Sequence, residues 1–287
     1  MISDITLGQY FPGKSRVHSL DPRTKLILTV LYITGVFVSN NPLGFVVLTA
    51  VTVGLVFMSG ISFKILWKSV KPLMVILLVT AAINIFMTDG SGKPLLDLGF
   101  AQIYTEGIVK AFFMAYRVVM VIIGTSVLLT YTTTPISLTD GIESLLSPLK
   151  KVGVPVHAFA MMMSIALRFI PTLVEETEKI MNAQKSRGAD FSNGTLVQRA
   201  KALIPILIPL FASSFKRAEE LATAMECRCY RGDSNRTKLV KLELKSMDYL
   251  WLALSALIFA SIILLAILPY NYIVDSVIYN VIFYRII

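Results

Sequence analysis

Five long apolar runs constrain this chain more than any other feature of its sequence. They cover residues 26–39, 44–59, 72–88, 108–131 and 249–269. A helix needs about 20 mostly apolar residues to cross a hydrocarbon core roughly 30 Å thick, and these runs reach or approach that length. Charged residues make up only 16% of the chain and the mean hydropathy is +0.71, whereas soluble domains carry about 25% charge. The sequence therefore excludes a soluble enzyme and a disordered chain and predicts an integral membrane protein.

Basic residues are distributed unevenly between the predicted loops. Residues 1–25 hold four Lys or Arg, residues 60–71 hold three and residues 132–247 hold sixteen, which together are 23 of the 27 in the chain. The predicted loops on the other side hold a single one, Lys93. Because cytoplasmic loops of membrane proteins carry an excess of Lys and Arg, this asymmetry predicts a cytoplasmic N-terminus. Five crossings then place the C-terminus outside.

The same charges divide the chain into three parts. Residues 1–131 are expected to form a membrane domain with four spans, residues 132–247 a cytoplasmic coupling domain, and residues 248–287 a last span followed by a tail, 270–287, at the membrane interface. The middle part interleaves 16 basic and 11 acidic residues with apolar ones at helical spacing, which predicts helices that bury one face against each other beneath the membrane. The predicted fold class is an all-α integral membrane protein with about five transmembrane helices and a cytoplasmic three-helix coupling region.

A short internal repeat marks the ends of two of these helices. One helix is expected over 155–186 and another over 195–229, and they lead into Ala-Gln-Lys-Ser-Arg-Gly-Ala and Ala-Met-Glu-Cys-Arg-Cys-Tyr. Each segment places an arginine, Arg187 or Arg228, between small neighbours. The helix dipole alone favours an arginine at a helix C-terminus. The guanidinium is also a rigid fork of five donors suited to the acidic side chains or carbonyls of a docked protein, and the duplication at matched helix ends favours docking.

The sequence resembles the transmembrane T component of energy-coupling factor (ECF) transporters, the CbiQ/EcfT-like family, over its whole length. The resemblance depends on the N-terminal segment 10–25, on Ala-Leu-Arg-Phe-Ile-Pro at 166–171 and on the two arginine segments. It implies a non-catalytic scaffold in a prokaryotic plasma membrane. Such a scaffold transmits the ATP-driven motion of two cytoplasmic ABC ATPase subunits to a separate substrate-binding membrane subunit, for uptake of vitamins or other micronutrients.

The resemblance also implies which residues dock onto the ATPases. In the family, two short X-Arg-X motifs at the ends of cytoplasmic helices enter grooves on the two ATPase subunits. Here they correspond to Ser186, Arg187, Gly188, Cys227, Arg228 and Cys229. The cysteines replace the family's usual Ala or Gly, and since a free cysteine is itself small and apolar, we expect the second motif to keep its role. The chain is expected to bind no cofactor, metal or nucleic acid, because ATP and Mg²⁺ are bound by the partner subunits.

Two motifs in the sequence are set aside. Residues 8–15 match the phosphate-binding pattern G-x-x-x-x-G-K-[ST], but Pro12 removes a backbone donor. Residues 18–22 do not continue a helix, and no hydrophobic strand follows to build the rest of an NTPase sheet. Cys227 and Cys229 could be half of a zinc site, but the two histidines of the chain are distant in sequence, and a zinc site usually needs four ligands. We therefore predict neither nucleotide binding nor a zinc site in this chain.

Two other functions remain as alternatives. A conventional ABC permease subunit with its own substrate path should place polar residues along several spans. A membrane-bound lipid-modifying enzyme should gather His, Asp and Glu near one interface. The sequence has neither feature, and both alternatives are therefore less favoured than the coupling scaffold.

Arg117 is the one charge well inside a predicted span. Because an intramembrane charge is costly unless it faces a partner or a cavity, we expect either a hydrogen bond to a backbone carbonyl or to Asn84, or a functional role. The acidic cluster of Glu175, Glu176 and Glu178 is expected to face water or to pair with Lys179.

Overall fold

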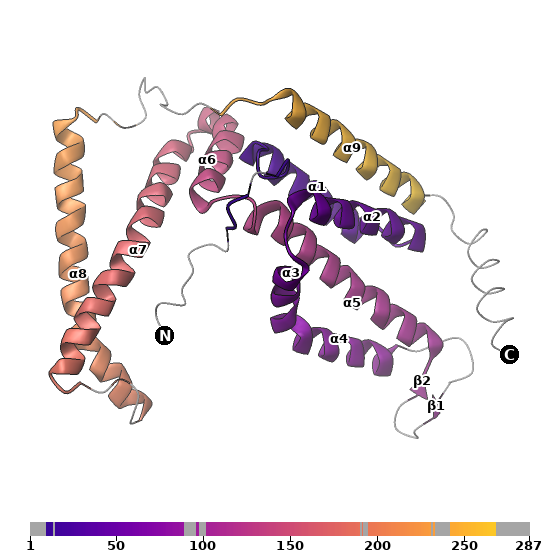
Figure 1. Cartoon of the computed structure of the whole chain (residues 1–287), viewed down its shortest axis with the longest axis horizontal. Helices are drawn as coiled ribbons and strands as arrows, with labels where there is room; N and C mark the ends of the chain where they lie inside the picture. The colour runs from indigo at the N-terminus through magenta and orange to yellow at the C-terminus, as the bar shows by residue number, and fades with distance from the viewer. Residues whose placement is uncertain are drawn as a thin grey trace, which may run out of the picture. The chain divides into compact units, whose positions relative to one another are not determined.

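The structure is a computed structural model that describes residues 10–13, 15–88, 96–97, 102–189, 191, 195–230, 232 and 242–267. These residues are helical apart from turns, connections and one short antiparallel pair, β1 (Leu96–Asp97) with β2 (Gln102–Ile103) (Figure 1). Lys14 of the phosphate-loop pattern, Lys93 and the tail 270–287 lie outside the described residues.

The chain divides into two compact units. One comprises Tyr10–Thr134 and Leu242–Ile287, and we call it the bundle unit. The other comprises Met1–Gln9 and Pro135–Lys241, and we call it the insert unit. The units meet at 134/135 and 241/242, whereas the predicted boundaries are at 131/132 and 247/248. The division into membrane and cytoplasmic parts stays a prediction.

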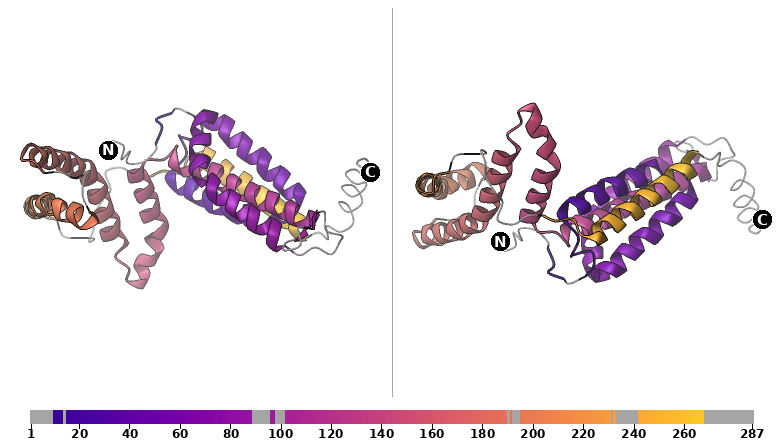
Figure 2. Two further views of the ribbon diagram at one scale, coloured as in Figure 1. Left: turned by 90° about the horizontal axis from the view of Figure 1, so that it is seen from below. Right: turned by 90° about the horizontal axis from the view of Figure 1, so that it is seen from above.

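The bundle unit is built from long helices that run side by side (Figure 2). Its elements are α1 (Pro22–Val38), α2 (Pro42–Ser59), α3 (Phe63–Val70), the 3₁₀ turn η1 (Lys71–Leu73), α4 (Met74–Met87), α5 (Thr105–Thr125), the π-helix η2 (Ser126–Thr130) and α9 (Ser246–Ile267). Local sequence sets several of their ends. Pro22 and Pro42 begin α1 and α2, where a missing N–H costs nothing. Gly60, with φ +68°, ends α2 in the left-handed conformation that glycine adopts readily.

Helix α1 lies at the centre of the bundle unit and packs against α2, α5, η2 and α9. The hydroxyl of the buried Tyr32 on α1 lies 2.7 Å from Thr52 Oγ1 on α2 and donates to the Met120 carbonyl oxygen on α5 (3.0 Å). A Cβ at Gly124 of α5 would overlap the Tyr32 ring, so this glycine permits the close approach of the two helices. The core consists of Tyr32, Val36, Leu48, Leu55, Leu66, Val127, Leu128, Tyr131 and Ile262.

The insert unit contains α6 (Pro135–Leu146), the 3₁₀ segment η3 (Ser147–Val152), α7 (Val156–Ser186) and α8 (Leu196–Cys227). Helix α6 packs against α7, and α7 packs against α8. The Thr195 hydroxyl and the Gln198 side chain form a reciprocal capping box at the start of α8, which satisfies two otherwise unpaired backbone donors. The helices predicted over 155–186 and 195–229 are confirmed as α7 and α8.

Five helices among the described residues are long and apolar enough to cross a membrane. They are Pro42–Ser59, Phe63–Met87, Thr105–Thr130, Val156–Ser186 and Ser246–Ile267. The all-α membrane class is confirmed, but the set of spans differs from the prediction in two places. The run 26–39 is part of α1, whose 17 residues extend about 25 Å before the Asn-Asn-Pro turn ends it. Helix α7 meets the criterion because its first 18 residues carry a single charge, Arg168, although we assigned this helix to the cytoplasm from its charged second half.

Candidate functional site

Helix α7 ends in a backbone arrangement that turns the chain sharply at the first arginine. Arg187 occupies the C-cap position and Gly188 follows with φ +87°. The Gly188 N–H donates to the Lys185 carbonyl (2.9 Å), and the Ala189 N–H donates to the Gln184 carbonyl (3.0 Å). These two bonds define a Schellman motif, which satisfies the last carbonyls of a helix.

Helix α8 ends in the same way at the second arginine. Arg228 occupies the C-cap position, the Cys229 N–H donates to the Glu226 carbonyl (2.8 Å), and the Tyr230 N–H donates to the Met225 carbonyl (3.0 Å). Cys229 has φ +56° and is the one non-glycine residue with positive φ in the described part of the chain. The predicted repeat is therefore a repeat of backbone geometry, with an arginine at each C-cap.

The six predicted docking residues are all exposed. They are Ser186, Arg187, Gly188, Cys227, Arg228 and Cys229. Both cysteines are free, and within the described residues neither guanidinium has a hydrogen-bond or ion-pair partner. Each arginine therefore presents its full set of donors to the solvent at the end of a long helix. We call the two ends, residues 186–188 and 227–229, the arginine tips.

A polar contact joins α7 and α8 between the two arginine tips. Glu176 on α7 accepts hydrogen bonds from Ser213 Oγ and Arg217 Nη2 on α8, each at 2.5 Å. Glu176 precedes Arg187 by eleven residues, and Arg217 precedes Arg228 by eleven residues, so each tip lies about 16 Å along its helix from this contact. The C-terminal ends of α7 and α8 point to opposite ends of the pair (Figure 1). The two tips are thus related by an approximate two-fold arrangement within the insert unit.

The prediction for Glu176 was wrong, because it expected solvent or Lys179 as its partner. A signal for the correct partner was present in the sequence. Glu176 and Arg217 are separated by 41 residues, the same spacing that separates the two tip arginines. The repeat therefore placed the ion pair at equivalent positions of the two helices.

The structure places Arg117 at the C-terminal end of α1. Its Nη2 donates to the Ser39 carbonyl oxygen (2.7 Å) and to Asn40 Oδ1 (3.4 Å), and its guanidinium lies 5.5 Å from the centre of the Phe45 ring. Of the two hydrogen-bond partners that we expected, the backbone carbonyl is correct, while Asn84 bonds within its own helix. A cation at the last carbonyls of a helix is favoured by the helix dipole, and here it caps a helix that is short for a span.

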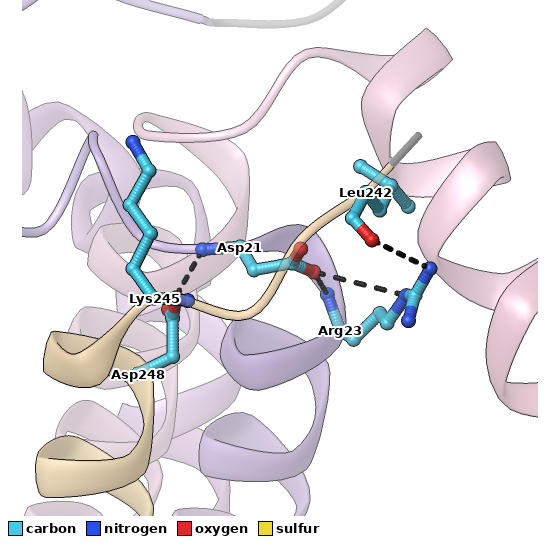
Figure 3. A network of polar contacts seen from close by, with 5 residues as sticks. All are labelled: Asp21, Arg23, Leu242, Lys245 and Asp248. Atoms are coloured by element: carbon cyan, nitrogen blue, oxygen red, sulfur yellow. Dashed lines mark hydrogen bonds and ion pairs between the residues drawn. The ribbon is translucent and has the colours of Figure 1, made fainter. Parts of the chain in front are cut away.

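A network of charged residues that we did not predict from the sequence lies at the N-terminal ends of α1 and α9 (Figure 3). Asp21 caps α1 by accepting from the Arg23 N–H (2.8 Å). The Asp248 carboxylate accepts from the Asp21 N–H (2.9 Å) and from the Lys245 N–H (2.8 Å). Arg23 Nη2 reaches the Leu242 carbonyl oxygen at 3.5 Å. The network therefore connects the first turn of α1 to the chain that enters α9.

Lys25 extends this network into the interior of the bundle unit. Its side chain is 2% exposed, and Nζ donates to the carbonyl oxygens of Thr132 (2.8 Å) and His18 (3.2 Å). Burial lowers the pKa of Lys25 to about 8, although the nearby carboxylates of Asp248 and Asp21 act in the opposite direction. The lysine lies before the apolar run of α1 and stands on the same helical turn as Arg23.

Neither set-aside motif gains support from the described residues. No group of three or more His, Cys, Asp or Glu could hold a metal ion within the part of the chain that the structure describes. A phosphate-binding loop needs a helix that begins at its lysine, whereas the chain forms turns over 16–19 and α1 begins at Pro22.

Comparison with known proteins gives a match over most of the chain. A family model named CbiQ, described as "Cobalt transport protein", matches residues 13–239. Three similar proteins carry the name "Energy-coupling factor transporter transmembrane protein EcfT". The one from Clostridium kluyveri is 52% identical over 266 residues, which are 93% of this chain and 98% of that protein. The one from Acidaminococcus fermentans is 52% identical over 250 residues (87% and 92%), and the one from Bacillus subtilis is 47% identical over 266 residues (93% and 97%).

Proposed function

Because the chain belongs to the CbiQ family and is a transmembrane component of the energy-coupling factor type, we propose that it links two cytoplasmic ATPase subunits to a substrate-binding membrane subunit. The observation that carries this proposal is the pair of arginine tips. Two exposed guanidinium groups, with the same Schellman geometry at opposite ends of one helix pair, suit a partner that itself consists of two similar subunits. In this proposal each tip docks onto one of the two ATPase subunits.

The helix pair serves as the moving part. Helices α7 and α8 have 31 and 32 residues, about 46 and 48 Å in length. Glu176 joins the two helices through its contacts with Ser213 and Arg217, which lie between the two tips. When ATP closes the two ATPase subunits on each other, the tips are drawn together, and the joined helices carry this displacement along the insert unit. The chain itself transmits displacement and performs no bond chemistry.

ATP, Mg²⁺ and the transported solute are assigned to the partner subunits. The spans of the bundle unit are nearly free of charge, so they offer few groups that would recognise a polar vitamin or micronutrient. The excess of basic residues over 1–25, 60–71 and 132–247 supports a cytoplasmic insert, which is the side on which ATP is available.

The two native cysteines allow a direct test of docking. Cys227 and Cys229 are the only cysteines in the sequence, and both are exposed within one tip. We expect a maleimide reagent to label the purified chain and the ATPase pair to protect it from labelling. In a C227S/C229S chain, a single cysteine at the exposed Ser147 of η3 should stay reactive and serves as the matched control.

Charge reversal at the tips gives the decisive comparison. R187E and R228E should each weaken ATPase binding, because loss of one desolvated charge partner costs about 2–5 kcal/mol and reversal adds repulsion. The double variant should release the ATPases, since two linked contacts reinforce each other. R199E, an exposed basic position in the first turn of α8 outside both tips, should bind normally. Full protection of the cysteines in the double variant, or equal loss in R199E, would contradict the assignment of the tips as docking sites.

A further inference from the structure

The chain leaves the bundle unit after Thr134 and returns to it before Leu242, and we call these two points the first and the second passage. Within the bundle unit, the first turn of α1 holds the chain beside both passages. Lys25 Nζ donates to the Thr132 carbonyl oxygen (2.8 Å), and Arg23 Nη2 donates to the Leu242 carbonyl oxygen (3.5 Å). One helical turn therefore fixes the backbone on the way into the insert unit and on the way out of it (Figure 3 draws the second of these contacts).

The contact at the first passage, from Lys25 to Thr132, is buried, and its acceptor is a backbone carbonyl oxygen. Lys25 is 2% exposed and Thr132 is 3% exposed. A buried lysine is costly unless its ammonium group is fully hydrogen-bonded, and a methionine would fill the same space at no such cost. The lysine instead bonds to two backbone carbonyls, which ties the ammonium group to the path of the chain. A second bond, from the Phe11 N–H to the Tyr131 carbonyl (3.1 Å), holds the adjoining residue.

The contact at the second passage belongs to a wider set of bonds around α9. Asp248 accepts from the Asp21 N–H and from the Lys245 N–H, so the residues between Leu242 and the start of α9 are bonded to the start of α1. Asp248 is 1% exposed and Asp21 is 8% exposed. The chain that returns from the insert unit is thus bonded to α1 before it enters the last helix of the bundle.

Helix α1 also packs against the two elements that lead to the passages. It contacts η2, which ends at Thr130 just before the first passage, and α9, which begins at Ser246 just after the second. A displacement that arrives through either passage therefore acts on α1 through hydrogen bonds at its first turn and through packing along its length.

We propose that Arg23 and Lys25 act as positioning residues, a clamp that couples displacement of the insert unit to the helices of the bundle unit. The clamp consists of Arg23, Lys25 and their acceptor carbonyls at Leu242 and Thr132. That ATPases supply the displacement rests on the proposed function. That the two side chains hold both passages does not, so the two statements are tested separately.

The first test uses the full-length chain alone in detergent. Hydrogen exchange measured by mass spectrometry should show faster exchange around residues 130–134 in K25M and around residues 242–248 in R23M. We expect about a tenfold or larger increase, because a hydrogen bond to a charged group is lost and the segment opens locally. The matched controls are K68M and R16M, which remove exposed cations of the same bundle unit and should leave both segments unchanged.

The second test uses the assembled transporter in liposomes. K25M and R23M should keep the ATPases bound, as read by protection of the two native cysteines, and should keep hydrolysing ATP. Solute uptake per ATP hydrolysed should fall by about fivefold or more, whereas K68M and R16M keep the wild-type ratio. K25R should restore part of the ratio in comparison with K25M, because an arginine keeps a buried cation that can donate to the Thr132 carbonyl.

The outcomes separate the clamp from the proposed function. Faster exchange at the passages together with an unchanged uptake ratio would overturn the clamp, and so would unchanged exchange in both variants. If the ATPases do not protect the cysteines of the wild-type chain from maleimide, the docking proposal is overturned. The hydrogen-exchange result would still stand, because it is measured on the chain alone. If K25M does not fold, as judged by size-exclusion chromatography, R23M decides the question, since Arg23 is partly exposed and its loss leaves no cavity in the core.

Discussion

At Cys229 an L-amino acid holds the left-handed backbone conformation that Gly188 holds at the other tip. A side chain in this conformation costs roughly 1–2 kcal/mol, and glycine avoids the cost. We expect C229G to raise the free energy of unfolding by about 1 kcal/mol and G188A to lower it by a similar amount. Thermal unfolding of the two variants in detergent checks both signs. Lower stability of C229G would mean that the cysteine side chain makes a stabilising contact.

Lys25 predicts a pH dependence of stability whose sign follows from its environment. Burial lowers its pKa from 10.5 to about 8 in the folded chain, against the effect of Asp248 and Asp21. Between about pH 8 and 10.5 the unfolded chain therefore binds more protons than the folded chain, so stability rises with pH through this interval. The full effect is of the order of 3 kcal/mol.

The measurement compares wild type with K25M between pH 7.5 and 10. As the pH rises, the free energy of unfolding of the wild type should increase relative to that of K25M. A pH-independent difference would show that the folded-state pKa of Lys25 is not lowered.

At the scale of elements, the contact between α7 and α8 predicts that the separation of the two tips is narrowly defined. Glu176 and Arg217 are about one-fifth and one-third exposed, so the pair contributes little more than an exposed ion pair, up to about 1 kcal/mol. We expect the ion pair to restrict the distance between the two tips. An S186C/C229S chain carries one cysteine at each tip, and spin labels at positions 186 and 227 report the distance between them.

We expect one narrow distance distribution in that chain and a broader one after E176Q. The charge swap E176R/R217E should narrow the distribution again, because it restores the pair with the charges exchanged. Equal widths in all three chains would show that helix packing alone sets the separation of the tips.

Local features of the helices were predictable from the sequence, whereas contacts between distant segments were not. The helix that follows Thr195 and the turn after Arg187 depend on neighbouring residues and were correctly located. The bonds from Lys25 to Thr132 and from Asp21 to Asp248 join residues 107 and 227 positions apart, and no local pattern records such pairs. Length and apolar composition alone also give a different set of spans at α1 and α7 from the predicted one. An apolar run shows that a helix must be buried, and both a bilayer and neighbouring helices can bury it.

At the scale of the whole molecule, the charge asymmetry predicts how the chain is oriented. In a C227S/C229S background, a cysteine at Asn40, between α1 and α2, should react with a membrane-impermeant maleimide in intact cells. A cysteine at Ser62, between α2 and α3, should react only in inverted vesicles, and the native cysteines of the wild-type chain should behave like it. This expectation follows from the basic residues of 60–71 and 132–247. Labelling of position 62 from outside would reverse the orientation and remove the insert unit from the side of the ATPases.

The two tips share a backbone geometry but differ in their flanking side chains, Ser and Gly at one and two cysteines at the other. If partner subunits dock at the tips as proposed, one polypeptide offers them two ends that are alike in shape and unlike in chemistry. A pair of identical subunits would then bind in two equivalent orientations, and this degeneracy would favour binding by about 0.4 kcal/mol. A pair of different subunits would bind in one preferred orientation, so the unlike flanks would determine which subunit docks at which tip.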